Sequence, residues 1–229
     1  MWLTTGERRG DFGKLNKDMY GRKNVGQSTP SNLVNLTSVL QAWRVDVVEE
    51  SGWRTRGTLP FTPEGIIVHH TGGNPIGDAP SLHVVRDTGR PRDDIPPPLC
   101  NILLARSGVA HIVAALKANH AGLGNSHVLE QVRQDIPPTE DATVLHLSDD
   151  IPGNQWFYGI EVQNTGLPDD PYPPVQIEAL VRCCAALCSS YGWTNARVIH
   201  HREWTARKSD MSYRGPLRLE VLKQRAAGP

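Results

Sequence analysis

Apolar runs and alternating segments divide most of the chain into predicted strands and helices. Residues 65–69 form a nearly unbroken apolar run, which is typical of a central strand covered on both faces. Further strand signals lie at 45–48, 101–106, 109–114, 159–163 and 196–200. The second and third of these predict a hairpin that turns near Ser107-Gly108. We predict helices at 31–43, 81–87, 127–134, 175–191 and 216–224. This mixture predicts an α/β or α+β domain around a central sheet.

The N-terminal segment differs from the rest of the chain, which suggests one domain with an N-terminal appendage. Residues 1–30 are polar, have more Lys and Arg than acids and show no period, so we expect a flexible N-terminal arm. Residues 31–229 then form the domain. Within it, residues 124–155 are rich in proline and acids, and connections of that length usually have a function or are mobile.

Composition excludes several classes of function. Lys and Arg (24) balance Asp and Glu (24), so the footprint of a general nucleic-acid binder is absent. No apolar run approaches the roughly 20 residues that a membrane helix needs, so we expect no stable membrane insertion. The charged start of the chain is not followed by the apolar core of a secretory signal. We therefore expect synthesis in a cytoplasm and dependence on another factor for exit.

The four cysteines fit a packed core better than a metal site. Cys183, Cys184 and Cys188 lie in a segment whose apolar residues recur with helical period, and Cys100 lies in a predicted strand. Flanking ligands at zinc-finger spacing are missing. We expect small apolar side chains packed between helix and sheet, and reduced thiols fit a cytoplasmic origin.

Polar residues capable of chemistry follow three of the predicted strands. The run 65–69 ends in His69-His70, Glu161 stands in an apolar strand, and the strand 196–200 leads into His201 and Asp210. Imidazole and carboxylate are zinc ligands, and three protein ligands leave a fourth position for water. A strand seldom buries a charge without a reason. The pattern indicates a metal-dependent hydrolase.

Four motifs in a fixed order carry a family resemblance over residues 65–211. They are Val68-His69-His70-Thr71, Asn119-His120-Ala121-Gly122, Gly159-Ile160-Glu161, and His201-Arg202-Glu203-Trp204-Thr205 with Arg207-Lys208-Ser209-Asp210. Together they resemble the zinc-dependent N-acetylmuramoyl-L-alanine amidases of the type 2 amidase and peptidoglycan-recognition superfamily, above all the amidase modules of bacteriophage endolysins. The resemblance implies a mixed sheet of five or six strands, helices on both faces, and zinc at one end of the sheet.

The resemblance also implies the zinc ligands. Neighbouring strand residues point to opposite faces, so only one member of each His-His pair can bind the metal. In the family's motifs these are His69 and His201, and the spacing from Lys208 makes Asp210 the third ligand. The family commonly has proline after this aspartate, where this chain has Met211. Proline would only rigidify the turn, so we expect the ligand to be retained.

Two further residues are expected to act in catalysis. Glu161 is the candidate general base and then general acid, since burial would raise the pKa of its carboxyl toward neutrality. The alternative is a structural carboxylate paired with an arginine. Lys208 is the candidate for an ammonium beside the developing oxyanion. The alternative is a solvated loop lysine.

Substrate contacts are expected from Thr71, Asn119 and His120. In the family, the loop of Asn119-His120-Ala121-Gly122 borders the substrate cleft. We expect His120 to face the substrate and not to be a fourth ligand, because a closed four-ligand site would exclude water.

The function implied is hydrolysis of the amide between the lactyl group of N-acetylmuramic acid and L-alanine in peptidoglycan. We expect a monomeric phage lytic enzyme with antimicrobial action, made in the host cytoplasm and acting on the wall after release through a membrane pore. Two alternatives stay open. One is a non-catalytic peptidoglycan-binding module, although such proteins typically lose a zinc ligand. The other is a zinc peptidase that cuts within the stem peptide.

Overall fold

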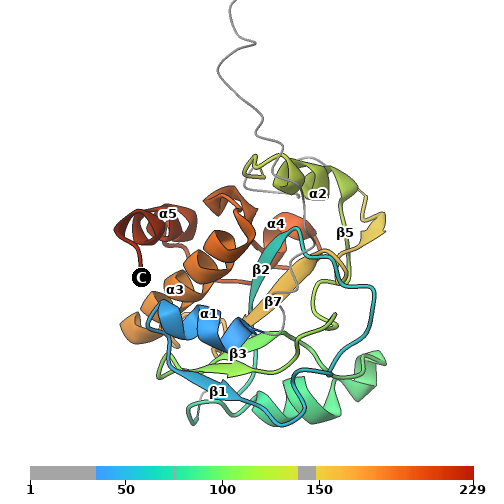
Figure 1. The fold of residues 1–229 in the computed structure, drawn as a ribbon. Helices are drawn as coiled ribbons and strands as arrows, with labels where there is room; N and C mark the ends of the chain where they lie inside the picture. Colours follow the sequence, from blue (N-terminus) through green and yellow to red (C-terminus); the bar gives the residue numbers. More distant parts are fainter. Residues whose placement is uncertain (1–34, 75, 139–147) are drawn as a thin grey trace, which may run out of the picture. The chain divides into compact units, whose positions relative to one another are not determined.

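A six-stranded mixed sheet forms the centre of the fold, as a computed structural model of the chain shows (Figure 1). The structure describes residues 35–74, 76–138 and 148–229, so the predicted arm 1–30 lies outside the described residues. The strands follow the order β1 (Val47–Glu49), β4 (Ala110–Ile112), β3 (Ile102–Leu104), β7 (Phe157–Val162), β2 (Gly65–His70) and β8 (Val198–His200). The mixed sheet of the prediction is confirmed.

Strand direction brings the polar strand ends to one edge of the sheet. β2 lies between β7 and β8 and is parallel to both, and β3 is parallel to β7. The carboxyl ends of these four strands therefore meet at the same edge, and the register pairs His69 on β2 directly with Glu161 on β7. β3 and β4 form the predicted antiparallel hairpin, and β1 pairs with β4 as an edge strand.

Helices cover both faces of the sheet, which explains why β2 is apolar throughout. On one face, α1 (Leu36–Ala42), α3 (Pro174–Tyr191) and α5 (Leu217–Ala227) pack with Ile66 and Val68 of β2 (Figure 1). On the other, α2 (Ser126–Arg133) and α4 (His201–Trp204) pack with Ile67. Alternate residues of a strand point to opposite faces, so β2 needs apolar side chains at consecutive positions.

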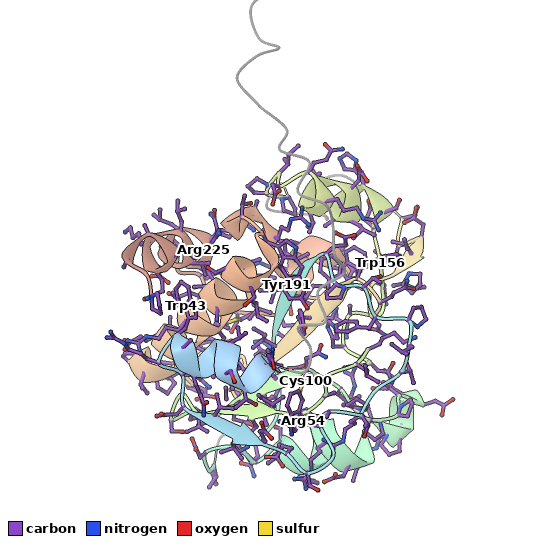
Figure 2. The ribbon with its side chains drawn as sticks, in the orientation of Figure 1. Trp43, Arg54, Cys100, Trp156, Tyr191 and Arg225 are labelled. Atoms are coloured by element: carbon purple, nitrogen blue, oxygen red, sulfur yellow. The ribbon has the colours of Figure 1, made fainter. Side chains whose placement is uncertain are left out.

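The longest helix, α3, has clear start and stop signals. Pro174 occupies its first turn, where a missing N–H costs nothing, and Gly192 ends it in the left-handed conformation. All four cysteines of the chain are free and buried: three lie on α3, and Cys100 lies in the interior near β3 (Figure 2). Their predicted role as packing residues is confirmed.

Two segments refine the prediction. The predicted helix 81–87 is present over residues 82–88, but most of it, η2 (Val84–Thr88), is π-helical, and a short 3-10 turn, η3 (Pro91–Asp93), follows it. The segment 124–155 is more ordered than a long loop. It contains α2, and β5 (Leu123–Gly124) pairs with β6 (Ile151–Pro152). Residues 139–147 lie outside the described part.

Side-chain contacts explain why α2 is held in place. Asn125 caps the helix by accepting a hydrogen bond from the His127 N–H, and the Asp150 carboxylate accepts two from Ser126. Trp156 lies beside α2 (Figure 2), with the Arg133 guanidinium 4.7 Å from the centre of its ring.

A second 3-10 turn, η4 (Asn195–Arg197), leads into β8, and the predicted terminal helix is present as α5. Within the part of the chain that the structure describes, no helix combines the length and the apolar character needed to cross a bilayer.

Candidate metal centre

Three potential ligand atoms converge at the carboxyl edge of the sheet. His69 comes from β2, His201 is the first residue of α4, and Asp210 lies in the loop after α4. The two Nδ1 atoms are 3.0 Å apart, and the Asp210 Oδ2 atom is 3.1 Å from that of His69 and 3.0 Å from that of His201. The structure thus brings together the three residues that the sequence nominated as ligands.

Hydrogen bonds behind the two imidazoles define which ring nitrogens carry protons. The His201 Nε2 atom lies 3.2 Å from the Ala121 carbonyl oxygen, which can only accept, so this nitrogen donates. The same argument makes His120 Nε2 a donor to the Phe157 carbonyl oxygen at 3.0 Å. His120 Nδ1 is then an acceptor, and His69 Nε2, 3.0 Å away, must donate to it.

The consequence is a set of lone pairs directed at one point. With protons on both Nε2 atoms, the Nδ1 atoms of His69 and His201 can direct lone pairs toward the Asp210 carboxylate. Burial first, and then the neighbouring His201, lowers the pKa of His69 to about 4, so its ring is neutral at pH 7. Three acceptors facing one another need a cation between them. Two imidazoles and a carboxylate are a donor set of the kind that zinc takes, so the residues present fit that metal.

The other member of each histidine pair points away from this centre. His70 lies on the opposite face of the sheet, where its Nδ1 is 3.0 Å from the Tyr172 hydroxyl and accepts from the Ser212 N–H. His200 is also buried, and its Nδ1 has no partner among the described residues. Alternation along the strands produces this separation.

His120 occupies a different place from the one expected. The prediction had it facing the substrate. The structure places its imidazole behind His69, 5% exposed, with both ring nitrogens in hydrogen bonds. The absence of a side chain at Gly159 on β7 leaves the space that this ring occupies, because a Cβ atom on Gly159 would lie 2.5 Å from the His120 ring. His120 therefore acts on the candidate ligand His69 and not on the solvent side of the site, a role that no local sequence signal distinguishes from a cleft residue.

Asn154 holds the loop that carries His120, and sequence reasoning missed it. Its side-chain Oδ1 accepts hydrogen bonds from the backbone N–H groups of His120, Ala121 and Gly122, at 3.1, 2.8 and 3.2 Å. The Ala121 carbonyl then orients His201, as described above. An asparagine more than 30 positions from the loop gives no signal in the sequence that would connect the two.

Glu161 lies beside the candidate ligands without an ion-pair partner. Its Oε2 atom is buried and has no hydrogen-bond partner among the described residues, and the described residues offer it no ion pair with an arginine. Burial raises the pKa of its carboxyl to about 8, the negative charge of Asp210 adds to the rise, and Arg90 and Lys208 oppose it. An unpaired carboxyl of this kind at a cluster of polar groups is a candidate proton carrier.

Lys208 lies in the loop between α4 and Asp210. It is partly exposed, and its positive charge lowers the pKa of both Glu161 and His69. The turn that presents Asp210 is held by Arg202, whose N–H donates to the Asp210 carbonyl at 2.7 Å and whose guanidinium donates to the Met211 carbonyl. These bonds anchor the turn that runs from Asp210 into Met211.

The remaining two expected substrate contacts are both engaged in bonds within the protein. The Thr71 hydroxyl donates to the Asn164 carbonyl at 3.1 Å, and the Asn119 side-chain amide donates to the Pro96 carbonyl at 3.0 Å. Both side chains are partly exposed, so each retains a face toward solvent. Their observed bonds shape the loops around the centre.

Comparison with known proteins agrees with this geometry. The family model described as N-acetylmuramoyl-L-alanine amidase matches residues 59–213, which include every candidate ligand. No curated protein matches the chain. Among solved structures, the catalytic domain of XlyA is similar, with 17% identity and a TM-score of 0.50 over 77% of this chain and 99% of that one.

Two other solved structures are similar over comparable lengths. The endolysin Ph2119 from the Thermus scotoductus MAT2119 bacteriophage Ph2119 has 19% identity and a TM-score of 0.43, covering 78% of this chain and 98% of its own. The endolysin amidase LysCS from Clostridium intestinale URNW has 14% identity and a TM-score of 0.44, covering 80% and 97%. At 17% identity, the likeness to the XlyA domain shows a shared fold and no more.

Proposed function

The chain belongs to the N-acetylmuramoyl-L-alanine amidase family, and from this premise we propose that it is a zinc-dependent hydrolase of peptidoglycan. The bond cut is the amide between the lactyl group of N-acetylmuramic acid and L-alanine. The observation that supports the metal is the convergence of two unprotonated Nδ1 atoms and one carboxylate oxygen. His69, His201 and Asp210 would hold the zinc, which supplies Lewis-acid chemistry toward the carbonyl and the attacking water.

Residues of the chain carry out proton transfer, stabilise the developing negative charge and orient the ligands. Glu161 takes a proton from the attacking water at its unpartnered carboxylate oxygen and delivers it to the leaving nitrogen of L-alanine. The Lys208 ammonium lies beside the carbonyl oxygen as negative charge develops on it. His120 and the Ala121 carbonyl keep the imidazoles of the ligands in the required tautomer and orientation.

Digestion of purified cell wall tests the proposal against both alternatives. An amidase releases new N-terminal alanine from the stem peptide. A peptidase acting within the stem would release an internal amine instead, and a binding module would release nothing. The complete set of three candidate ligands favours catalysis over binding alone.

A lytic role rests on the motif resemblance to phage endolysin amidases. We propose that the enzyme acts as a monomer on the wall of the cell in which it is made, after release through a pore. Expression with and without a separate pore-forming protein tests this: lysis should require the pore. Rapid lysis without it would contradict dependence on release, and size-exclusion chromatography would check the monomer.

Lys208→Ala should lower turnover by about 10–10³-fold, the scale of losing one oxyanion donor, with little change in zinc content. Lys208→Arg should rescue only partly, because a planar guanidinium does not replace a compact ammonium. Zinc content and turnover are measured on the same preparation. Proportional loss of both would show instead that the lysine anchors the turn that carries Asp210.

Asn154→Leu should weaken zinc binding by about 10-fold or more, the scale seen when groups behind metal ligands are removed. Three backbone N–H groups lose their acceptor, and the Ala121 carbonyl that orients His201 is set free. Asn154→Asp keeps an oxygen at that place and is the matched control. Equal zinc affinity in the leucine variant, measured by competition with a chelator, would contradict this role.

A further inference from the structure

A polar cavity lies beside His200, whose side chain points away from the candidate metal centre. Its volume is about 380 Å³, and it opens between α4 and the first turn of α5. Its lining includes His200, which directly precedes the candidate ligand His201. Among the side chains that line this cavity, Arg202 alone has a place in the proposed amidase site, through the turn that carries Asp210.

Positive charge dominates the lining. Three arginines, Arg202, Arg214 and Arg218, face one carboxylate, Glu203. Glu203 is paired with Arg218 at 2.7 Å, and the Arg202 guanidinium is engaged with the Met211 carbonyl, so the charge available to a ligand is that of Arg214. Arg214 is exposed, and no ion pair within the described residues involves it. An anionic group would be attracted to this place.

Backbone donors from α5 are directed at the same cavity. The helix has 11 residues, and no side chain caps its first turn. The N–H of Leu217 is bonded to the Gly215 carbonyl and that of Glu220 to the Pro216 carbonyl. The N–H groups of Arg218 and Leu219, both in the lining, have no such acceptor in the described part of the chain. Free amides at the positive end of a helix dipole are suited to an anion.

The buried imidazole of His200 adds an independent observation. Its exposed fraction is 8%, and its Nδ1 is buried without a partner among the described residues. A histidine ring can donate from either nitrogen, so His200 adds to the lining a polar side chain that is more than nine-tenths buried and unpartnered at Nδ1 within the described residues.

We propose that this cavity binds an oxyanion group, a phosphate or a carboxylate. Guanidinium groups, free helix amides and an imidazole N–H are the donors that such groups require. The cell wall presents both kinds of anion, so the cavity is a second attachment point on the wall, away from the bond that is cut. Naming the wall as the source rests on the proposed function. The anion site itself does not.

Titration of the zinc-loaded full chain with inorganic phosphate, and separately with acetate at constant ionic strength, tests the site. Backbone amide resonances of Arg218 and Leu219 should shift and saturate. Arg214→Glu should weaken the binding about 10-fold or more, the scale of a charge-assisted contact. Lys223→Glu makes the same charge change at an exposed position of the same helix and should alter it less than about twofold.

The outcomes distinguish a phosphate ligand from a carboxylate ligand, and they test the anion site separately from the proposed amidase function. Tighter binding of phosphate indicates a phosphate-bearing wall polymer, and tighter binding of acetate indicates peptide carboxylates. Absence of saturable shifts at Arg218 and Leu219 with both anions, or equal weakening by Lys223→Glu, would overturn the site. Arg214→Glu should also reduce retention on insoluble wall while leaving hydrolysis of a small soluble muropeptide unchanged. If phosphate binds here but no variant hydrolyses muropeptide, the proposed function fails and the anion site stands.

Discussion

His69→Ala is expected to lose both stoichiometric zinc and wall hydrolysis. The His69 Nδ1 atom supplies one of the three converging lone pairs, 3.0 and 3.1 Å from the other two ligand atoms. A site with two protein ligands holds zinc far more weakly than one with three, so the purified variant should contain much less than one zinc per chain. Metal analysis and turbidity loss of a wall suspension measure the two effects together.

His70→Ala is the matched control for that variant. The two histidines are adjacent on β2, and both are mostly removed from solvent, yet His70 contacts Tyr172 and Ser212 on the opposite face. Its removal should cost stability on the scale of about one or two hydrogen bonds while zinc stays bound. The wild-type enzyme should lose activity to a chelator and recover it with zinc. Full zinc content in His69→Ala would refute the ligand assignment.

Local patterns were sufficient for the parts of the fold that depend on local physics. The apolar run of β2 and the helical period of α3 reflect burial against neighbours on both sides, which any sequence with that burial must show. Alternation along a strand also indicated that only one histidine of each pair could serve the metal, and the structure separates His69 from His70.

Contacts between distant segments explain what the sequence could not reveal. The place of His120 depends on the gap above Gly159 and on the Phe157 carbonyl, both on a strand about 40 positions away. Asn154 acts on the same loop from a segment that looked like an unstructured connection. Neither the contacts of His120 nor those of Asn154 produce a periodic or compositional pattern in the sequence. The hydrogen bonds behind the candidate ligands are therefore seen only in the folded structure.

The stability of the metal-free protein offers a test of how Glu161 is buried. Its folded-state pKa of about 8 lies above the unfolded value of 4.5, so its contribution to stability is fully present below pH 4.5 and is lost as the pH rises through 8. A glutamine at this position does not ionise, so Glu161→Gln removes the loss of stability at high pH. The variant should therefore unfold at a higher temperature than the metal-free parent at pH 8, and the difference should shrink toward pH 5. Calorimetry over this pH range measures it.

Glu161→Gln should leave zinc bound but lower turnover by about 10²-fold or more, the scale of losing general acid–base catalysis. The amide keeps the shape of the side chain and cannot accept the proton. Because Glu161 is a base only when ionised, the parent's activity should rise with pH through its pKa, which a bound dication moves below the metal-free value. That acidic limb should flatten in the variant. Turnover near that of the parent, with the limb unchanged, would make Glu161 a structural residue and require another proton carrier at the centre.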